Sequence, residues 1–88
     1  TLAYAVTTVA SKQSVGFTSA HVVVYADQDM WCLQGVNPVA TAPVADGAAG
    51  SMRLKSGEQY RVPVANSGNK FAFRAVTANG TVEITPAA

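Results

Sequence analysis

Valine outnumbers leucine by thirteen residues to three in this chain of 88 residues, and that imbalance limits the folds open to it. Side chains branched at Cβ fit the pleated surface of a sheet, whereas amphipathic helices are built mainly from leucine and other unbranched residues. No segment repeats apolar residues three and four positions apart over several turns, as a packed helix requires. Short stretches of alternating apolar and polar residues, separated by turn residues, occur along the whole chain instead. The sequence therefore predicts an all-β fold.

The alternating stretches predict about eight short strands, a number and spacing typical of a β-sandwich or a jelly-roll-like barrel. A length of 88 residues fits one small domain. We therefore expect residues 1–88 to form a single β domain without a linker. Residues 11–13 are expected to turn the chain between the first two strands. The expected strands cover residues 2–9, 14–18, 21–26, 30–34, 51–54, 59–64, 70–77 and 81–85.

Several local patterns predict how these strands are arranged. Residues 27–29 (DQD) and 79–80 (NG) are turn sequences, and each is expected to join two strands in a hairpin. The valine run at residues 22–24 is expected to be buried on both faces of its sheet. Pro63 places its strand at a sheet edge or at a bulge, because proline has no N–H to donate to a central ladder.

Residues 36–50 interrupt the strand pattern. They contain two prolines, an Asp-Gly pair and several alanines, and proline cannot complete a sheet ladder. We expect one long connection that runs over the surface. Connections longer than about 12–15 residues are uncommon in compact domains and are often functional. This segment is therefore either a binding element or a loop without a role.

Charged residues are scarce and nearly balanced. They make up 12% of the chain, against about 25% in a typical domain. A surface with so few charges suggests that another molecule covers part of it. The net charge of +1 is too small for a nucleic-acid footprint. No apolar run approaches the roughly 20 residues of a membrane span. We therefore expect neither a nucleic acid nor a membrane as a partner.

Residues that could perform chemistry are few and isolated in the sequence. Cys32 and His21 are the only cysteine and histidine, whereas a catalytic thiol needs a base and a metal needs clustered ligands. Asp27 and Asp29 could share a calcium ion, but turn hydrogen bonding is the favoured interpretation of this pair. No nucleophile elbow, paired carboxylates or phosphate loop is present. We expect no enzymatic activity and no cofactor, with Cys32 a small buried side chain.

Three stretches taken together resemble small proteins encoded in the head-morphogenesis regions of tailed bacteriophages. Residues 31–42 (WCLQGVNPVATA) are similar to that group's aromatic-x-x-x-Gly-x-Asn-Pro-x-Ala-Thr-Ala segment. Residues 51–62 (SMRLKSGEQYRV) resemble a small-Met-x-Leu-x-x-Gly pattern followed by an aromatic-x-Val strand. Residues 80–85 (GTVEIT) resemble a closing Gly-x-Val-x-Ile-Thr strand. The resemblance spans residues 30–85 and rests on turn-and-strand patterns.

The resemblance implies a bacteriophage virion structural protein, and most specifically a capsid decoration (cement) protein. Such a protein binds the major capsid protein and stabilises its shell. The resemblance further implies synthesis in the host cytoplasm, a place on the capsid surface, and a homo-oligomer, with a trimer favoured over a dimer. Two alternatives stay open: a tail- or fibre-associated structural protein, and a carbohydrate- or ligand-binding β-sandwich module with exposed aromatic residues.

Contacts between subunits are expected at the first strand, at the long connection and around Trp31. The first strand carries few charges and could pair with the edge of another chain. Aromatic residues, Met and Arg are enriched at interfaces, although a single Trp is more often part of a core. The residues expected to contact partners are Leu2, Tyr4, Trp31, Asn37, Pro38, Met52, Arg53 and Tyr60.

Overall fold

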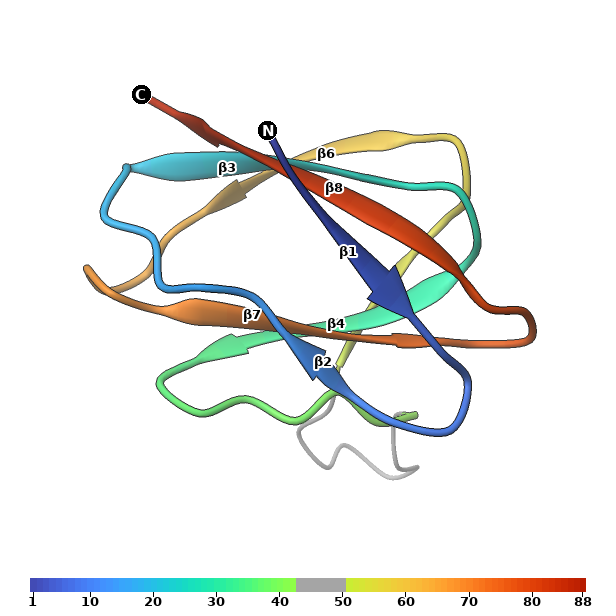
Figure 1. Ribbon diagram of the computed structural model, residues 1–88. Helices are drawn as coiled ribbons and strands as arrows, with labels where there is room; N and C mark the ends of the chain where they lie inside the picture. The colour runs from blue at the N-terminus through green and yellow to red at the C-terminus, as the bar shows by residue number, and fades with distance from the viewer. Residues whose placement is uncertain (43–50) are drawn as a thin grey trace.

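The computed structural model describes residues 1–42 and 51–88 and places them in two facing antiparallel sheets (Figure 1). These ranges contain no helix, so nothing helical in them is long and apolar enough to cross a membrane. The predicted all-β domain of eight short strands is confirmed. The strands are β1 (Leu2–Val6), β2 (Lys12–Gln13), β3 (His21–Ala26), β4 (Met30–Gly35), β5 (Met52–Leu54), β6 (Gln59–Pro63), β7 (Lys70–Ala75) and β8 (Gly80–Ala87).

The strands pair as nested arms of one antiparallel ribbon. β1 pairs with β8, β2 with β7, β3 with β6, and β4 with β5. Successive pairs alternate between the two sheets. Sheet I therefore has the order β1-β8-β3-β6, and sheet II has the order β2-β7-β4-β5. A long ribbon rolled up in this way is a double-sheet jelly roll.

The two predicted hairpins are wrong, although both turns exist. The turn after β3 leads into β4 of the other sheet, and the turn after β7 likewise crosses to β8. Turn side chains hold these crossings: the Thr81 N–H donates to Asp27 Oδ1 at 2.8 Å, and the Thr8 N–H donates to Asn79 Oδ1 at 3.0 Å. Turn residues predict where the chain reverses. They do not determine which sheet receives the next strand.

The second strand differs most from its prediction. It was expected at residues 14–18, but β2 consists of Lys12 and Gln13, inside the expected turn. β1 likewise ends at Val6 and not at residue 9. Beyond β2, the Ser14 N–H donates to the Phe71 carbonyl of β7 at 2.7 Å. The chain therefore follows β7 through isolated bonds after the regular ladder has ended.

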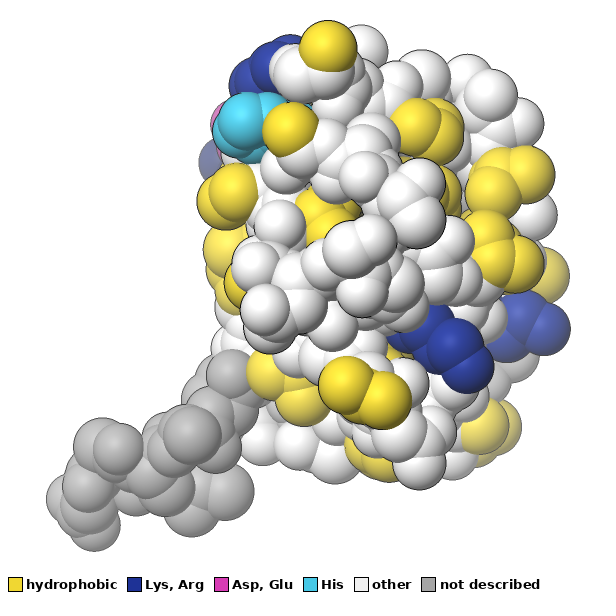
Figure 2. Space-filling model, turned by 90° about the vertical axis from the view of Figure 1, so that its left-hand side faces the viewer, with side chains coloured by type: hydrophobic (Ala, Val, Ile, Leu, Met, Phe, Trp, Pro, Cys, Tyr) yellow, Lys and Arg dark blue, Asp and Glu magenta, His cyan; other side chains and the backbone are white. Residues whose placement is uncertain are grey.

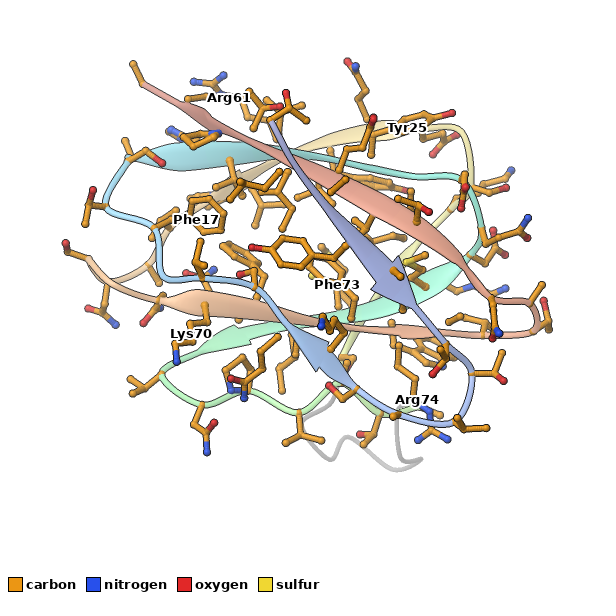
Figure 3. All side chains as sticks on the ribbon, in the orientation of Figure 1. Phe17, Tyr25, Arg61, Lys70, Phe73 and Arg74 are labelled. Carbon is orange, nitrogen blue, oxygen red and sulfur yellow. The ribbon has the colours of Figure 1, made fainter. Side chains whose placement is uncertain are left out.

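The core lies between the inner faces of the two sheets. Along β3, Val22 and Val24 are fully buried, while Val23 and Tyr25 are half-buried on the outer face. The predicted burial of β3 on both faces is therefore wrong. Pro63 lies on the edge strand β6, as predicted. Figure 3 shows Phe73 between the sheets and Tyr25 on the outer side of sheet I. The largest fully buried side chains are Phe71, Phe73, Met30, Leu54 and Ile84.

The first part of the connection between β4 and β5 is fixed against β2. The Gln13 amide Nε2 donates to Asn37 Oδ1 at 2.7 Å and to the Pro38 carbonyl at 2.9 Å. Within the described residues, the expected surface connection is therefore tied to the sheet edge. Its remainder, residues 43–50, lies outside the described residues.

Candidate functional site

In residues 1–42 and 51–88, no group of three or more His, Cys, Asp or Glu side chains could hold a metal ion. Cys32 faces the core, and burial raises its pKa to about 12. His21 begins β3, and its buried Nδ1 has no hydrogen-bond partner among the described residues. The side chain of Asp27 accepts the N–H of Thr81, as expected for a turn aspartate.

The first candidate surface is the Trp31 patch, which we define as Trp31, Arg53 and Asp29 on the outer side of sheet II. Trp31 of β4 lies opposite Arg53 of β5 in the sheet register. The guanidinium carbon of Arg53 is 5.4 Å from the centroid of the Trp31 ring. Arg53 Nη2 also bonds to Asp29 Oδ2 at 2.7 Å. Trp31 is half-buried on the outer face, so the alternative in which a single Trp belongs to the core does not apply to it.

Two donors hold the Asp29 carboxylate in this patch. The hydrogen bond from Arg53 lowers the pKa of Asp29, and the backbone N–H of Ser56, 2.9 Å from Asp29 Oδ1, lowers it further. Arg53 is thus fixed between an aromatic face and a carboxylate, while its side chain keeps 53% of its surface exposed. An arginine held in one geometry loses little rotamer freedom when a partner binds.

Met52 is close to this patch but faces a different direction. It lies opposite Cys32 in the register, so its side chain is on the other face of β5 from Arg53. Its side chain is 45% exposed at the rim of the sandwich. The structure therefore brings Trp31 and Arg53, two of the residues expected to contact partners, against each other and leaves Met52 on the other face of β5.

The second candidate surface is the free edge of β1. Its only ladder is the one with β8, and no backbone group of Leu2–Val6 bonds to any other described segment. Leu2 is 41% exposed. Tyr4 packs against the core, and its hydroxyl accepts the N–H of Val15 at 3.1 Å. Tyr4 therefore covers the core next to β1, and the outer backbone groups of β1 remain free to pair with another strand.

The other three sheet edges are protected against strand addition. β2 has two residues and β5 has three. β6 carries Arg61 and Pro63, and both charge and proline are devices that block edge pairing. Residues 1–11, by contrast, contain no charged side chain and no proline. β1 is the one described edge without such a device.

The remaining predicted contact residues have roles within the chain. Asn37 is exposed, but its amide oxygen accepts from Gln13. Pro38 is buried and presents no free side-chain surface. The hydroxyl of Tyr60 accepts the Lys55 N–H at 3.0 Å and donates to a carboxylate oxygen of Glu58 at 3.1 Å. The eight predicted residues thus do not form one continuous surface.

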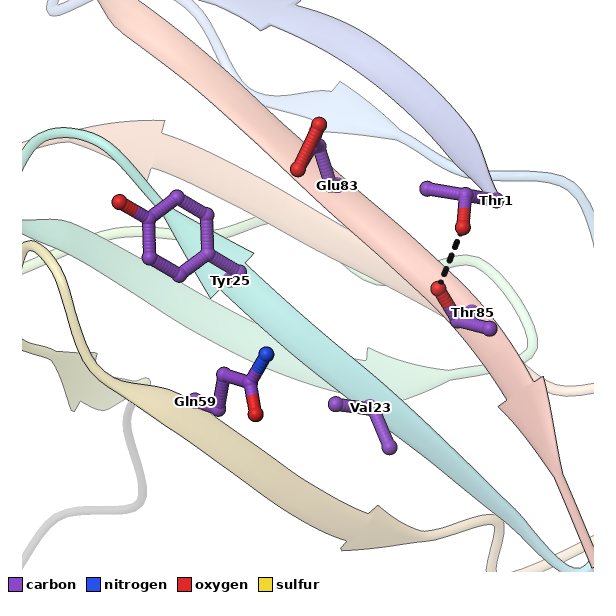
Figure 4. A pocket seen from close by; sticks show the side chains of 6 residues that line it. All are labelled: Thr1, Val23, Tyr25, Gln59, Glu83 and Thr85. Atoms are coloured by element: carbon purple, nitrogen blue, oxygen red, sulfur yellow. Dashed lines mark hydrogen bonds between the residues drawn. The ribbon is translucent and has the colours of Figure 1, made fainter.

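A third surface, which the sequence interpretation missed, is a hollow on the outer face of sheet I (Figure 4). It has a volume of about 330 Å³. Tyr25 lies opposite Gln59 on one side and Glu83 on the other, so these three side chains form one row across β6, β3 and β8. This row was not predicted from the sequence, because β3 was expected to be buried on both faces. The lining residues are Thr1, Val23, Tyr25, Gln59, Glu83 and Thr85.

Charged groups are sparse on the face turned toward the viewer in Figure 2, where apolar side chains are spread among polar and backbone surface. Exposed large apolar residues outside the candidate surfaces include Val9, Val15, Val36 and Val39.

No protein-family model, curated protein or solved structure matches the chain. The three surfaces themselves therefore provide the basis for a functional proposal.

Proposed function

We propose that this chain is a bacteriophage virion structural protein, a decoration protein that binds the major capsid protein on the capsid surface and stabilises the shell. The observation that carries the proposal is the unprotected edge of β1. An edge strand without charge, proline or bulge is a template for pairing with another chain. The resemblance of residues 30–85 to phage head-region proteins supports the same role, and viral capsid domains are among those built as jelly rolls.

The positions of the two edge surfaces support a bridging role. β1 contacts β2, which is one edge of sheet II, while β5 with Arg53 forms the opposite edge. A protein with contact surfaces at opposite edges can join two neighbouring subunits. Repetition over a shell multiplies modest contacts through avidity. This role needs no cleft, cofactor or titrating group.

The resemblance to phage head-region proteins also implies a homo-oligomer, with a trimer favoured over a dimer. A twofold dimer uses one surface on both copies, whereas a contact between two different surfaces of neighbouring copies produces a ring if its rotation closes and an open filament if it does not. The free edge of β1 and the Trp31 patch are two different surfaces.

The proposal is tested by sedimenting the purified protein with empty shells of the phage that encodes it. We expect the wild-type protein to sediment with the shells and the Arg53→Glu variant to bind at least about tenfold more weakly, since a centrally placed interface arginine is worth roughly 1–2 kcal/mol or more. Ser67→Glu, which adds a negative charge in the exposed turn after β6, serves as the control. Circular dichroism verifies that each variant is folded.

Two outcomes would overturn the proposal. One is a wild-type protein that stays in the supernatant at all shell concentrations. The other is electron microscopy of phage particles that locates the protein only in the tail. If shells bind Arg53→Glu and the wild type equally, the assignment of the Trp31 patch is wrong, and the β1 edge becomes the remaining contact.

A further inference from the structure

We propose that the hollow on the outer face of sheet I binds a neutral saccharide of one or two sugar units. Its volume of about 330 Å³ lies at the lower end of the range of about 300–1,000 Å³ found for small-molecule sites. The lining side chains come from three adjacent strands of one sheet and from Thr1 beside them. The site is therefore built on rigid elements, and the fold places its groups without any rearrangement.

The polar groups of the hollow are mostly available to a ligand. Among the six lining side chains, one hydrogen bond is formed, between the hydroxyls of Thr1 and Thr85 at 2.8 Å (Figure 4). The Tyr25 hydroxyl, the Gln59 amide and the Glu83 carboxylate form no bond with one another. Together they offer donors and acceptors on both sides of an aromatic ring.

The combination of an aromatic ring with flanking polar groups matches the chemistry of a pyranose. A pyranose has an apolar face of C–H groups and a rim of hydroxyls. The Tyr25 ring and Val23 provide an apolar surface for the C–H face. Glu83 accepts strongly from hydroxyl groups because it is charged, and Gln59 both donates and accepts. Each part of the sugar therefore has a partner of the right kind within the hollow.

Charge restricts the class of sugar. Glu83 is the one charged side chain that lines the hollow, and the α-amino group of Thr1, also at the hollow, is a cation. The nearest cation in the sheet register is Arg61, opposite Val23, and its guanidinium donates to the backbone carbonyl of Ala88. With one anion and one cation at the hollow, a neutral sugar leaves the charges balanced, whereas the carboxylate of a sialic acid or uronate adds a negative charge in excess. The hollow favours neutral sugars over acidic ones.

The test is a titration of the ¹⁵N-labelled protein, monitored by amide chemical shifts, with lactose, maltotriose and N,N′-diacetylchitobiose. We expect at least one of these neutral sugars to shift amides of β3, β6 and β8 around Tyr25, with a dissociation constant of about 1 mM, the affinity typical of a shallow site with few contacts. Lactose and 3′-sialyllactose form a matched pair that differs by one acidic sugar. We expect the acidic member to bind more weakly than lactose or not at all.

Variants separate the two parts of the site. Tyr25→Ala should abolish the shifts, whereas Tyr25→Phe should retain them because the ring face remains. Glu83→Gln should reduce the discrimination between lactose and 3′-sialyllactose. Lys12→Ala, on β2 of the other sheet, is the control and should bind as the wild type does. Tyr25 and Glu83 point outward, so these changes leave the core intact.

The inference is overturned if none of the three neutral sugars shifts these amides, or if Tyr25→Ala binds as the wild type does. It is also overturned if the same amides shift with protein concentration alone, because a second copy then occupies the hollow. The inference is independent of the proposed capsid role. Failure to bind shells leaves the sugar titration unaffected, and the reverse also holds.

Discussion

At the scale of single residues, Cys32 offers a direct measure of how closed the core is. The thiol faces inward from β4, opposite Phe73 of β7, and burial raises its pKa to about 12. A buried, un-ionised thiol is a poor nucleophile, since the thiolate is the reactive form. We expect a disulfide reagent to label the native protein slowly at neutral pH and the urea-unfolded protein rapidly. Equally rapid labelling of both states would contradict the placement of Cys32 in the core.

Asp29 links the Trp31 patch to acid stability. The Arg53 hydrogen bond, followed by the Ser56 N–H, holds the pKa of Asp29 below its ordinary value of 3.8. A carboxyl group with a depressed folded-state pKa stabilises the protein above its unfolded-state pKa, and this contribution is lost as the pH falls through the folded-state pKa. We expect Asp29→Asn to be less stable than the wild type at neutral pH and to approach it at pH values well below 3.8. Urea unfolding across this range measures the difference, and a constant difference would contradict the prediction.

At the scale of elements, one serine fastens the segment after β2 to β7. Ser14 Oγ accepts the buried N–H of Phe71 at 2.9 Å and donates to the Val15 carbonyl at 2.7 Å. Ser14→Ala leaves that N–H without a partner, which costs about 1–3 kcal/mol of unfolding free energy. Urea denaturation measures the loss. Ser67→Ala in an exposed turn is the matched control, and equal effects of the two variants would refute the assigned role of Ser14.

Sequence patterns predicted the strands whose residues alternate clearly, because alternation is a local property of the chain. A run of β-branched residues is a local signal of the same kind, and β3 begins and ends where its valine run placed it, at His21 and Ala26. β2 was missed because Lys12 and Gln13 show no such alternation. Its position depends instead on bonds to β7 and to the β4–β5 connection, far away in the sequence. The strands joined by each turn were wrongly paired for the same reason.

The candidate surfaces were predictable to different degrees. Trp31 and Arg53 were identified by residue type, and the register of β4 and β5 then places them opposite each other. The hollow could not be assembled from the sequence, because Tyr25, Gln59 and Glu83 become neighbours only once the order of sheet I is known. The available signal was the period of two along β3, which turns Val23 and Tyr25 outward.

At the scale of the whole molecule, the free edge of β1 predicts self-association that a single charge should weaken. Ala5 is exposed on β1, and a lysine on an edge strand opposes pairing with another chain. We expect light scattering to show a wild-type oligomer and a shift of Ala5→Lys toward the monomer. Ala78→Lys, in the exposed turn before β8, is the matched control. A monomeric wild type, or an Ala5→Lys oligomer as stable as the wild type, would contradict this prediction.

The nested pairing of the strands also determines the order in which the strand pairs can form. β4 and β5 are separated by the fewest residues and β1 and β8 by the most, and loop-closure entropy grows with that separation. Pairing therefore costs least at β4–β5 and is completed last at β1–β8. Among the eight described strands, β1 is synthesised first, and its partner β8 is synthesised last. β1, the uncharged strand proposed to join copies, is consequently the strand that stays unpaired longest during synthesis. Elongation proceeds at roughly 5–20 residues per second. Pairing of β1 with β8 and pairing of β1 with another copy therefore compete within the same few seconds.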